Sequence, residues 1–191
     1  MNTLQRKLIL ASKSPRRSFL LKQAGFEFEV NAMDIDETNY PADLSVKEVP
    51  AYLAREKARA AQVFTKDNEI IIASDSVVII DNEIFGKPTD YNDAVRILQA
   101  LSGRMHLVIT GVCLLSTEKE VVFSDVSKVY IDTLSREEID YYIEHYQPYD
   151  KAGAYAIQEW IGLCKVSKIE GTQSNIMGLP IHLVYQKLQA F

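Results

Sequence analysis

The chain has 191 residues, of which 47% are hydrophobic and 25% charged, and its net charge is −5. This composition is typical of a soluble globular protein, and we expect one domain over residues 1–191. A negative charge without a basic stripe argues against a nucleic-acid-binding module, and no apolar run is long enough to span a bilayer. Because Met1 to Lys7 contain no signal-peptide core, we expect a cytoplasmic protein without membrane partners.

Cysteine and histidine give no sign of a transition-metal site. Cys113 and Cys164 lack C-x-x-C spacing and lie in apolar runs, so we expect both to be buried, reduced thiols. No second His or Cys stands at metal-ligand spacing from His106, and we therefore expect His106 to be structural.

The first segment predicts a strand, a tight turn and a helix. An apolar run over residues 8–11 favours a buried strand, Ser14 before Pro15 is typical of a helix N-cap, and Gly25 supplies a stop. A helix N-terminus flanked by hydroxyls and cations suits a phosphate. Considered alone, an ordinary capped helix with solvated basic residues is slightly favoured. The polar residues at this turn are Ser12, Lys13, Ser14, Arg16 and Arg17.

A short strand is predicted over residues 26–30, which alternate strictly, and an acidic loop over residues 34–37 follows. That loop, which contains Glu37, is either solvated or able to offer an oxygen ligand to a hard cation. By itself the solvated interpretation is favoured. Ser45 and Glu48 then fit a capping box, although Pro50 indicates that regular helix begins only near that residue.

Lys57 lies within an apolar helical stripe. Leu53 and Ala61 stand four residues before and after it, so its side chain shares their face of the helix. A lysine at such a position either extends to the rim, which is the commoner case, or points into a cleft toward an anion.

The run over residues 69–80 is rich in β-branched residues and predicts a central strand, which Asp75 interrupts. An unpaired carboxylate buried in a strand costs several kcal/mol, so Asp75 needs hydroxyls, a cation or a bulge. Nothing else in residues 70–80 is charged, and we therefore favour a functional role for Asp75. If residues 81–83 close a hairpin, Lys87 returns toward the Asp75 end of the strand.

The remaining elements alternate between helices and strands. Thr89 or Asp90 can cap a helix that Ser102-Gly103 ends, and Ser135 with Glu138 forms a second capping box before another helix. Small residues over 150–158 permit close approach of the backbone to a ligand, or simply join a helix to a strand. Strands are predicted over residues 107–115, 121–123, 126–131 and 161–169, and a last helix over 181–190.

These motifs, in this order, resemble the Maf family of nucleoside triphosphate pyrophosphatases. The last long motif is similar to that of the subfamily acting on dTTP and UTP rather than on methylated GTP. The sequence departs from the family pattern at Ser76 (usually Thr), at Glu159 (usually Gly) and near Gly171-Thr172-Gln173. The matching motifs are Ser12-x-Ser14-Pro15-Arg16-Arg17, Asp36-Glu37, Leu53-Ala54-x-x-Lys57-Ala58, Ser74-Asp75-Ser76, Gly86-Lys87-Pro88, Leu101-Ser102-Gly103-Arg104-x-His106, Thr110-Gly111, Asp150 to Gln158 and Gly178-Leu179-Pro180.

The resemblance implies an α/β fold with a long, curved mixed sheet flanked by helices, two lobes and a central cleft. It also implies hydrolysis between the α- and β-phosphates, giving a nucleoside monophosphate and pyrophosphate, as a house-cleaning activity that can include modified pyrimidine nucleotides. The implied cofactor is Mg²⁺ or Mn²⁺, bound by Glu37 and Asp75. The implied catalytic residues are Asp75, Glu37, Lys57 and Lys87. The implied substrate-binding residues are Ser12, Ser14, Arg16, Arg17, Ser76 and Gln158, of which Arg16, Ser76 and Gln158 set the choice of base.

The alternative from another class is a non-catalytic, nucleotide-binding regulator of septum formation and cell division. Asp75 and Glu37 favour the enzyme, because a pure binding protein has no need to bury an acid beside phosphates. The expected ligand is in either case a nucleoside triphosphate. The oligomeric state stays open, with a homodimer as one alternative.

Overall fold

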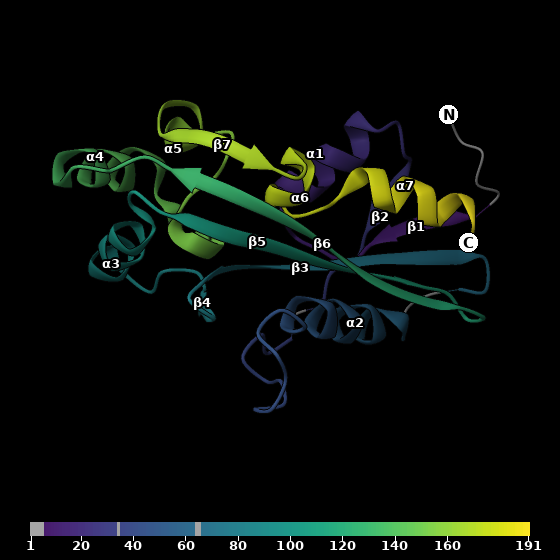
Figure 1. Ribbon diagram of the computed structural model, residues 1–191. Coiled ribbons are helices and arrows are strands. Elements are labelled where there is room, and N and C mark those ends of the chain that lie inside the picture. Colours follow the sequence, from purple (N-terminus) through teal and green to yellow (C-terminus); the bar gives the residue numbers. More distant parts are fainter. Residues whose placement is uncertain (1–5, 34, 64–65) are drawn as a thin grey trace. The chain divides into compact units, whose positions relative to one another are not determined.

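Figure 1 shows the computed structural model, which describes residues 6–33, 35–63 and 66–191. Two expectations fall partly outside these ranges, because they rest on Met1 in the first segment and on Asp34 in the acidic loop. Within these ranges the strands are β1 (Lys7–Leu10), β2 (Phe28–Val30), β3 (Glu69–Ile80), β4 (Glu83–Phe85), β5 (Met105–Leu115), β6 (Glu120–Ile131) and β7 (Val166–Glu170). The helices are α1 (Pro15–Gln23), α2 (Val49–Gln62), α3 (Tyr91–Leu101), α4 (Arg136–Tyr146), α5 (Trp160–Cys164), α6 (Gln173–Ile176) and α7 (Ile181–Gln189). Two 3₁₀ turns, η1 (Pro148–Asp150) and η2 (Ala152–Ala154), join α4 to α5.

The strands form one mixed sheet in the order β2-β1-β3-β5-β6-β7, with β4 paired to β3. Strand β1 pairs in parallel with β2 and β3, whereas the β3–β4 and β6–β7 pairs are antiparallel. The expected mixed sheet flanked by helices is therefore confirmed. The chain divides into two compact units: unit 1 is Met1–Asp75, Thr110–Asp125 and Gly178–Phe191, and unit 2 is Ser76–Ile109 and Val126–Met177.

In unit 1, alternate residues of the sheet face two different helical layers, as the two-residue period of a strand requires. Leu8, Leu10 and Ile70 pack against α1 and α7 on one face. On the other face, Ile9 and Ile71 pack against the alanines of α2. Figure 1 shows α2 on the opposite side of β3 from α7.

Close packing of α2 on the sheet depends on small side chains. Ala54, Ala58 and Ala61 are all completely buried. A Cβ at Gly111 of β5 would lie only 2.3 Å from the backbone nitrogen of Ala51, so glycine is required there. The start of α2 therefore lies directly on the backbone of β5.

In unit 2, α3 and α4 cover a core that includes Val78, Val108 and Val129 from the strands. Asp90 caps α3 by accepting from the backbone N–H of Asp93 at 2.8 Å. The predicted capping box of Ser135 and Glu138 is present at the start of α4. The predicted hairpin is present as well, with Val78 opposite Phe85.

Four local expectations are wrong. Residues 160–164 form α5 instead of part of a strand, because Gly162 packs directly on the backbone of Ile157 and Trp160 contacts Tyr141. Cys164, at the end of α5, is exposed, whereas Cys113 is buried as expected. Ser45 is not a helix cap, because α2 begins after Glu48, although the expected start of regular helix near Pro50 is confirmed. Ser14 is at the N-cap position of α1, but its side chain makes no capping hydrogen bond.

No helix in the described ranges is both long and apolar enough to cross a membrane.

Candidate active site

The first polar cluster lies where β1 runs into α1 in unit 1. The Ser12 side chain is buried, and its Oγ accepts from Arg17 Nη1 at 3.0 Å and from the backbone N–H of Ser14 at 3.2 Å. Arg17 Nε donates to the carbonyl oxygen of Gly178 at 2.9 Å, and Ser74 Oγ donates to the same oxygen at 3.2 Å. Arg17 thus ties the turn before α1 to the segment before α7.

The N-terminus of α1 keeps the features of an anion site. Ser14 does not cap it with its side chain, and no acidic residue lies in its first turn. Burial lowers the pKa of the Arg17 guanidinium, and the Arg16 charge lowers it further. The charges of Asp75 and Glu37 act in the opposite direction on this pKa, so these acids lie within electrostatic reach of Arg17.

The second polar cluster joins a helix, a strand and a loop of unit 1 through one ammonium group. Lys57 Nζ donates to Asp75 Oδ1 at 2.6 Å and to Glu37 Oε1 at 2.7 Å. The side chains of Lys57 and Asp75 are 11% and 9% exposed, and that of Glu37 is 40% exposed. Lys57 therefore points toward anions in the protein rather than to the rim, and Asp75 obtains the cation that a buried carboxylate needs.

The positions of Asp75 in β3 and of Lys57 in α2 explain why these two side chains meet. Asp75 continues the series of Ile71 and Ala73, which face α2, and Lys57 lies on the α2 face that packs on the sheet. In the acidic loop, neighbouring residues behave differently. Asp36 is exposed and accepts from the backbone and hydroxyl of Thr38, while Glu37 turns toward Lys57.

The two carboxylates fit a hard divalent cation. Glu37 Oε1 and Asp75 Oδ1 both bind the same nitrogen, so these oxygens lie close together. Over the described ranges no group of three or more His, Cys, Asp and Glu side chains could hold a metal. Mg²⁺ characteristically binds through one or two carboxylates and completes its shell with water and substrate phosphates, and Glu37 and Asp75 could supply the carboxylates of such a donor set.

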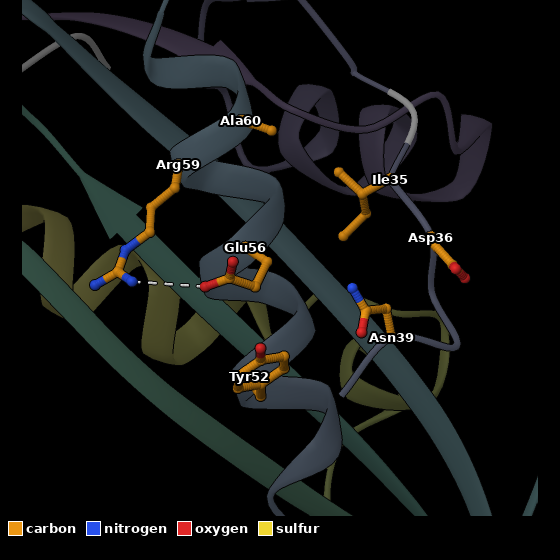
Figure 2. Close-up of a pocket in the computed structure, with 7 residues that line it drawn as sticks. All are labelled: Ile35, Asp36, Asn39, Tyr52, Glu56, Arg59 and Ala60. Carbon is orange, nitrogen blue, oxygen red and sulfur yellow. Dashed lines mark ion pairs between the residues drawn. The ribbon is translucent and has the colours of Figure 1, made fainter. Parts of the chain in front are cut away.

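A separate pocket of about 310 Å³ lies between the acidic loop and α2. Figure 2 shows its lining, in which Arg59 and Glu56 form an ion pair at 3.6 Å. None of the ten residues implied by the family resemblance lines it. The lining residues are Ile35, Asp36, Asn39, Tyr52, Glu56, Arg59 and Ala60.

In unit 2 the structure brings two sequence motifs together. The backbone N–H of Gly153 donates to the carbonyl oxygen of Gly86 at 3.0 Å, so the motif containing Lys87 lies beside η2. Gly153 has φ +72°, and a Cβ there would lie 2.7 Å from Val78. The motif thus needs glycine both for its conformation and for space. Lys87 is exposed and Ser76 is half-buried.

The segment after η2 carries Gln158, whose side chain is exposed. Its neighbour Glu159 turns inward, accepts from Tyr142 Oη and lies 3.5 Å from Lys151 Nζ. Lys151 is only 6% exposed. Sequence reasoning did not assign a role to Lys151 or Tyr142, although the position of Lys151 inside the 150–158 motif was a signal.

His106 and Tyr155 form a second buried pair in unit 2. His106 Nε2 lies 2.8 Å from Tyr155 Oη, and the two rings meet edge to face. Burial lowers the pKa of His106 to about 4, and it raises the pKa of Tyr155. Both groups are therefore neutral at pH 7, and the expected structural role of His106 agrees with its burial.

The fold is that of an α/β protein with a mixed sheet flanked by helices, and comparison with known sequences identifies the family. Residues 7–191 match the family model for Maf-like proteins. The chain belongs to the Maf family. A relative from Porphyromonas gingivalis (strain ATCC 33277) named dTTP/UTP pyrophosphatase is 47% identical over 192 residues, covering 100% of this chain and 96% of that protein.

Two further relatives carry the same name. The protein of Bacteroides thetaiotaomicron is 48% identical over 183 residues, covering 95% of this chain and 94% of the relative. That of Parabacteroides distasonis is 45% identical over 191 residues, covering 100% and 98%. Among solved structures, a HAM1 protein from Coxiella burnetii matches with a TM-score of 0.58 over 98% of this chain and 100% of that chain. At 15% identity this last likeness supports the fold alone.

Proposed function

We propose that this protein is a nucleoside triphosphate pyrophosphatase that hydrolyses dTTP and UTP to the monophosphate and pyrophosphate. The observation that carries the proposal is the similarity, over the whole chain, to relatives named dTTP/UTP pyrophosphatase. The proposal treats residues 1–191 as one Maf-like domain that acts on the free nucleotides of the cytoplasm. The alternative of a non-catalytic regulator of division is not favoured, because these relatives carry the name of an enzyme.

In this proposal the phosphates bind cations and hydroxyls of the chain. Ser12 and Ser14 lie at the uncapped N-terminus of α1, which suits an anion. Arg17 holds this turn in place through Ser12 and Gly178. The remaining cations assigned to the phosphates are Arg16, Lys57 and Lys87.

Asp75 is the proposed group that orients the attacking water and takes its proton. Its Oδ1 accepts from Lys57, which leaves Oδ2 for the water. Water attacks the α-phosphorus, the bond to the bridging oxygen breaks, and pyrophosphate leaves. A divalent cation held by Glu37 and Asp75 would neutralise charge on the phosphates. With or without this cation, Lys57 Nζ holds both carboxylates on the same side of α2.

The proposed choice of base rests on Arg16, Ser76 and Gln158, the positions that the family resemblance implies. A uracil or thymine edge has an N3–H donor between two carbonyl acceptors, and the Gln158 amide offers one donor group and one acceptor. Cytosine presents the opposite pattern at two of these positions. The exposed Gln158 side chain is compatible with this role.

The test is pyrophosphate release from dTTP, UTP, CTP, ATP and GTP, with Mg²⁺, with Mn²⁺ and in excess EDTA. We expect the highest kcat/KM for dTTP and UTP, and loss of activity in EDTA that either cation restores. Full activity in EDTA would contradict the assigned cation. A purine nucleotide or CTP as the best substrate would contradict the assigned specificity.

A further inference from the structure

Glu159 stands where the family pattern usually has glycine, and its side chain turns into unit 2. One carboxylate oxygen accepts from Tyr142 Oη, and the other lies 3.5 Å from Lys151 Nζ. The side chain is 20% exposed, while the adjacent Gln158 is exposed. Two neighbouring residues therefore have opposite orientations, one toward the protein and one toward solvent.

Tyr142 links the Glu159 carboxylate to the backbone just before Gln158 through hydrogen bonds of its hydroxyl. Its hydroxyl donates to Glu159 and accepts from the backbone N–H of Ala156 at 3.0 Å. The backbone N–H of Glu159 in turn donates to the carbonyl oxygen of Ala156 at 3.1 Å. The turn that carries Gln158 is thus closed by its own backbone and tied through Tyr142 to α4.

The negative charge of Glu159 also compensates the buried ammonium group of Lys151. Lys151 is 6% exposed, and its other acid partner, Asp150 at 2.8 Å, has a side chain that is 59% exposed. A buried ammonium group is costly without a nearby counter-charge. Burial and the hydrogen bond to Glu159 both raise the pKa of Tyr142, so this hydroxyl stays protonated and continues to donate.

We propose that Glu159 is a positioning residue that holds Gln158 in the orientation from which it reads the base, acting through Tyr142 and Lys151. This inference rests on the proposed function only where it assigns base reading to Gln158. Both Glu159 oxygens are engaged by protein groups, which argues against direct contact of this carboxylate with the base. Direct contact is an outcome that the experiment distinguishes.

The experiment compares Glu159→Gly, Glu159→Gln and Tyr142→Phe with the wild type. Amide hydrogen exchange across residues 154–160 measures the order of the segment without any nucleotide. We expect at least about tenfold faster exchange at Ala156 in Glu159→Gly and in Tyr142→Phe, because both variants lose the bridge. Glu159→Gln keeps an oxygen acceptor for Tyr142, so its exchange should stay close to that of the wild type.

The kinetic measurement is kcat/KM for dTTP, UTP and CTP in the same variants. In Glu159→Gly we expect the preference for dTTP and UTP over CTP to fall about tenfold, mainly through KM, and Glu159→Gln to recover most of it. Asp90→Ala, which removes the cap of α3, is the matched control for a general loss of stability. It should leave the preference unchanged.

The two measurements separate the possible failures. Unchanged exchange at Ala156 in Glu159→Gly would overturn the positioning role whatever the enzyme hydrolyses. Normal exchange with altered preference in both Glu159 variants would show direct contact with the base, which also overturns it. Failure of the wild type to hydrolyse dTTP and UTP would refute the proposed function, and the exchange data would still decide whether Glu159 orders the segment.

Discussion

The two polar regions of this protein are stabilised in different ways. In unit 1, Lys57 and Asp75 project from a helix and a strand and form an ionic cluster with Glu37. In unit 2, the segment that carries Gln158 has little regular structure and is held by backbone hydrogen bonds and by Tyr142, whose hydroxyl accepts from Ala156 and donates to Glu159. In the proposed function the first region acts on phosphates, which every nucleotide shares, and its groups can stand on rigid elements. The second region is proposed to distinguish one base from another, which needs local bonds that set a side-chain orientation.

The largest expected effect tests the ionic region. Asp75→Asn should lower kcat by about 10²–10⁴-fold, because a positioned base is lost, while nucleotide still binds. Removing a negative charge beside phosphates should keep or improve affinity. The measurement is kcat together with nucleotide binding by calorimetry. Asp67→Asn, at an exposed position, is the control. Wild-type turnover in Asp75→Asn would make Asp75 a structural residue.

The second prediction tests the ionic role of Lys57 toward Asp75. Lys57→Met leaves Asp75 buried without its cation, and breaking a buried pair in this way typically costs about 3–5 kcal/mol. We therefore expect a lower Tm in EDTA, and partial recovery when Mg²⁺ takes the place of the ammonium group. Thermal unfolding with and without Mg²⁺ measures this, with Lys22→Met, at an exposed position, as the control. Equal destabilisation with and without Mg²⁺ would contradict a site in which Lys57 and Mg²⁺ neutralise the same carboxylates.

The third prediction concerns the neutral pair of His106 and Tyr155 in unit 2. The pKa of His106 is about 4 in the folded protein, below the ordinary value of 6.5, so the unfolded chain binds the proton first as the pH falls. Stability from this group is complete above pH 6.5 and decreases by up to about 1.4 kcal/mol per pH unit down to about pH 4.

His106→Gln should flatten this dependence, as measured by urea unfolding between pH 7 and pH 4. His182, which is exposed, supplies the control variant His182→Gln, and this variant should keep the wild-type slope. An unchanged slope in His106→Gln would mean that His106 is not held neutral by burial.

The smallest expected effect tests the segment that carries Gln158 and its proposed role in reading the base. Gln158→Ala should reduce the preference for dTTP and UTP over CTP by about tenfold, or about 1.4 kcal/mol, with kcat for dTTP less affected. The measurement is kcat/KM on the five nucleoside triphosphates. A preference order identical to that of the wild type would show that Gln158 does not read the base, and the proposed difference between the two regions would then not hold.

Local sequence signals were sufficient where one pattern dominated. The β-branched run predicted β3, the pair of Ser135 and Glu138 predicted the start of α4, and the spacing around Lys57 placed it on the buried face of α2. They failed for α5, because the close packing of Gly162 on the backbone of Ile157 and the contact of Trp160 with the distant Tyr141 override the β-strand pattern of the local sequence. The same limit applies to Cys164, whose apolar neighbours suggested burial.

The sequence by itself determined that Asp75 and Lys57 each need a partner, since a charge on a buried strand or an apolar helical face is costly alone. It could not say that they are partners of each other, because 18 residues separate them and only packing of α2 on the sheet brings them together. Likewise, Glu159 was visible as a departure from the family pattern. Only the tertiary structure decided that its carboxylate faces Tyr142 and Lys151, because side-chain direction depends on the whole surrounding fold.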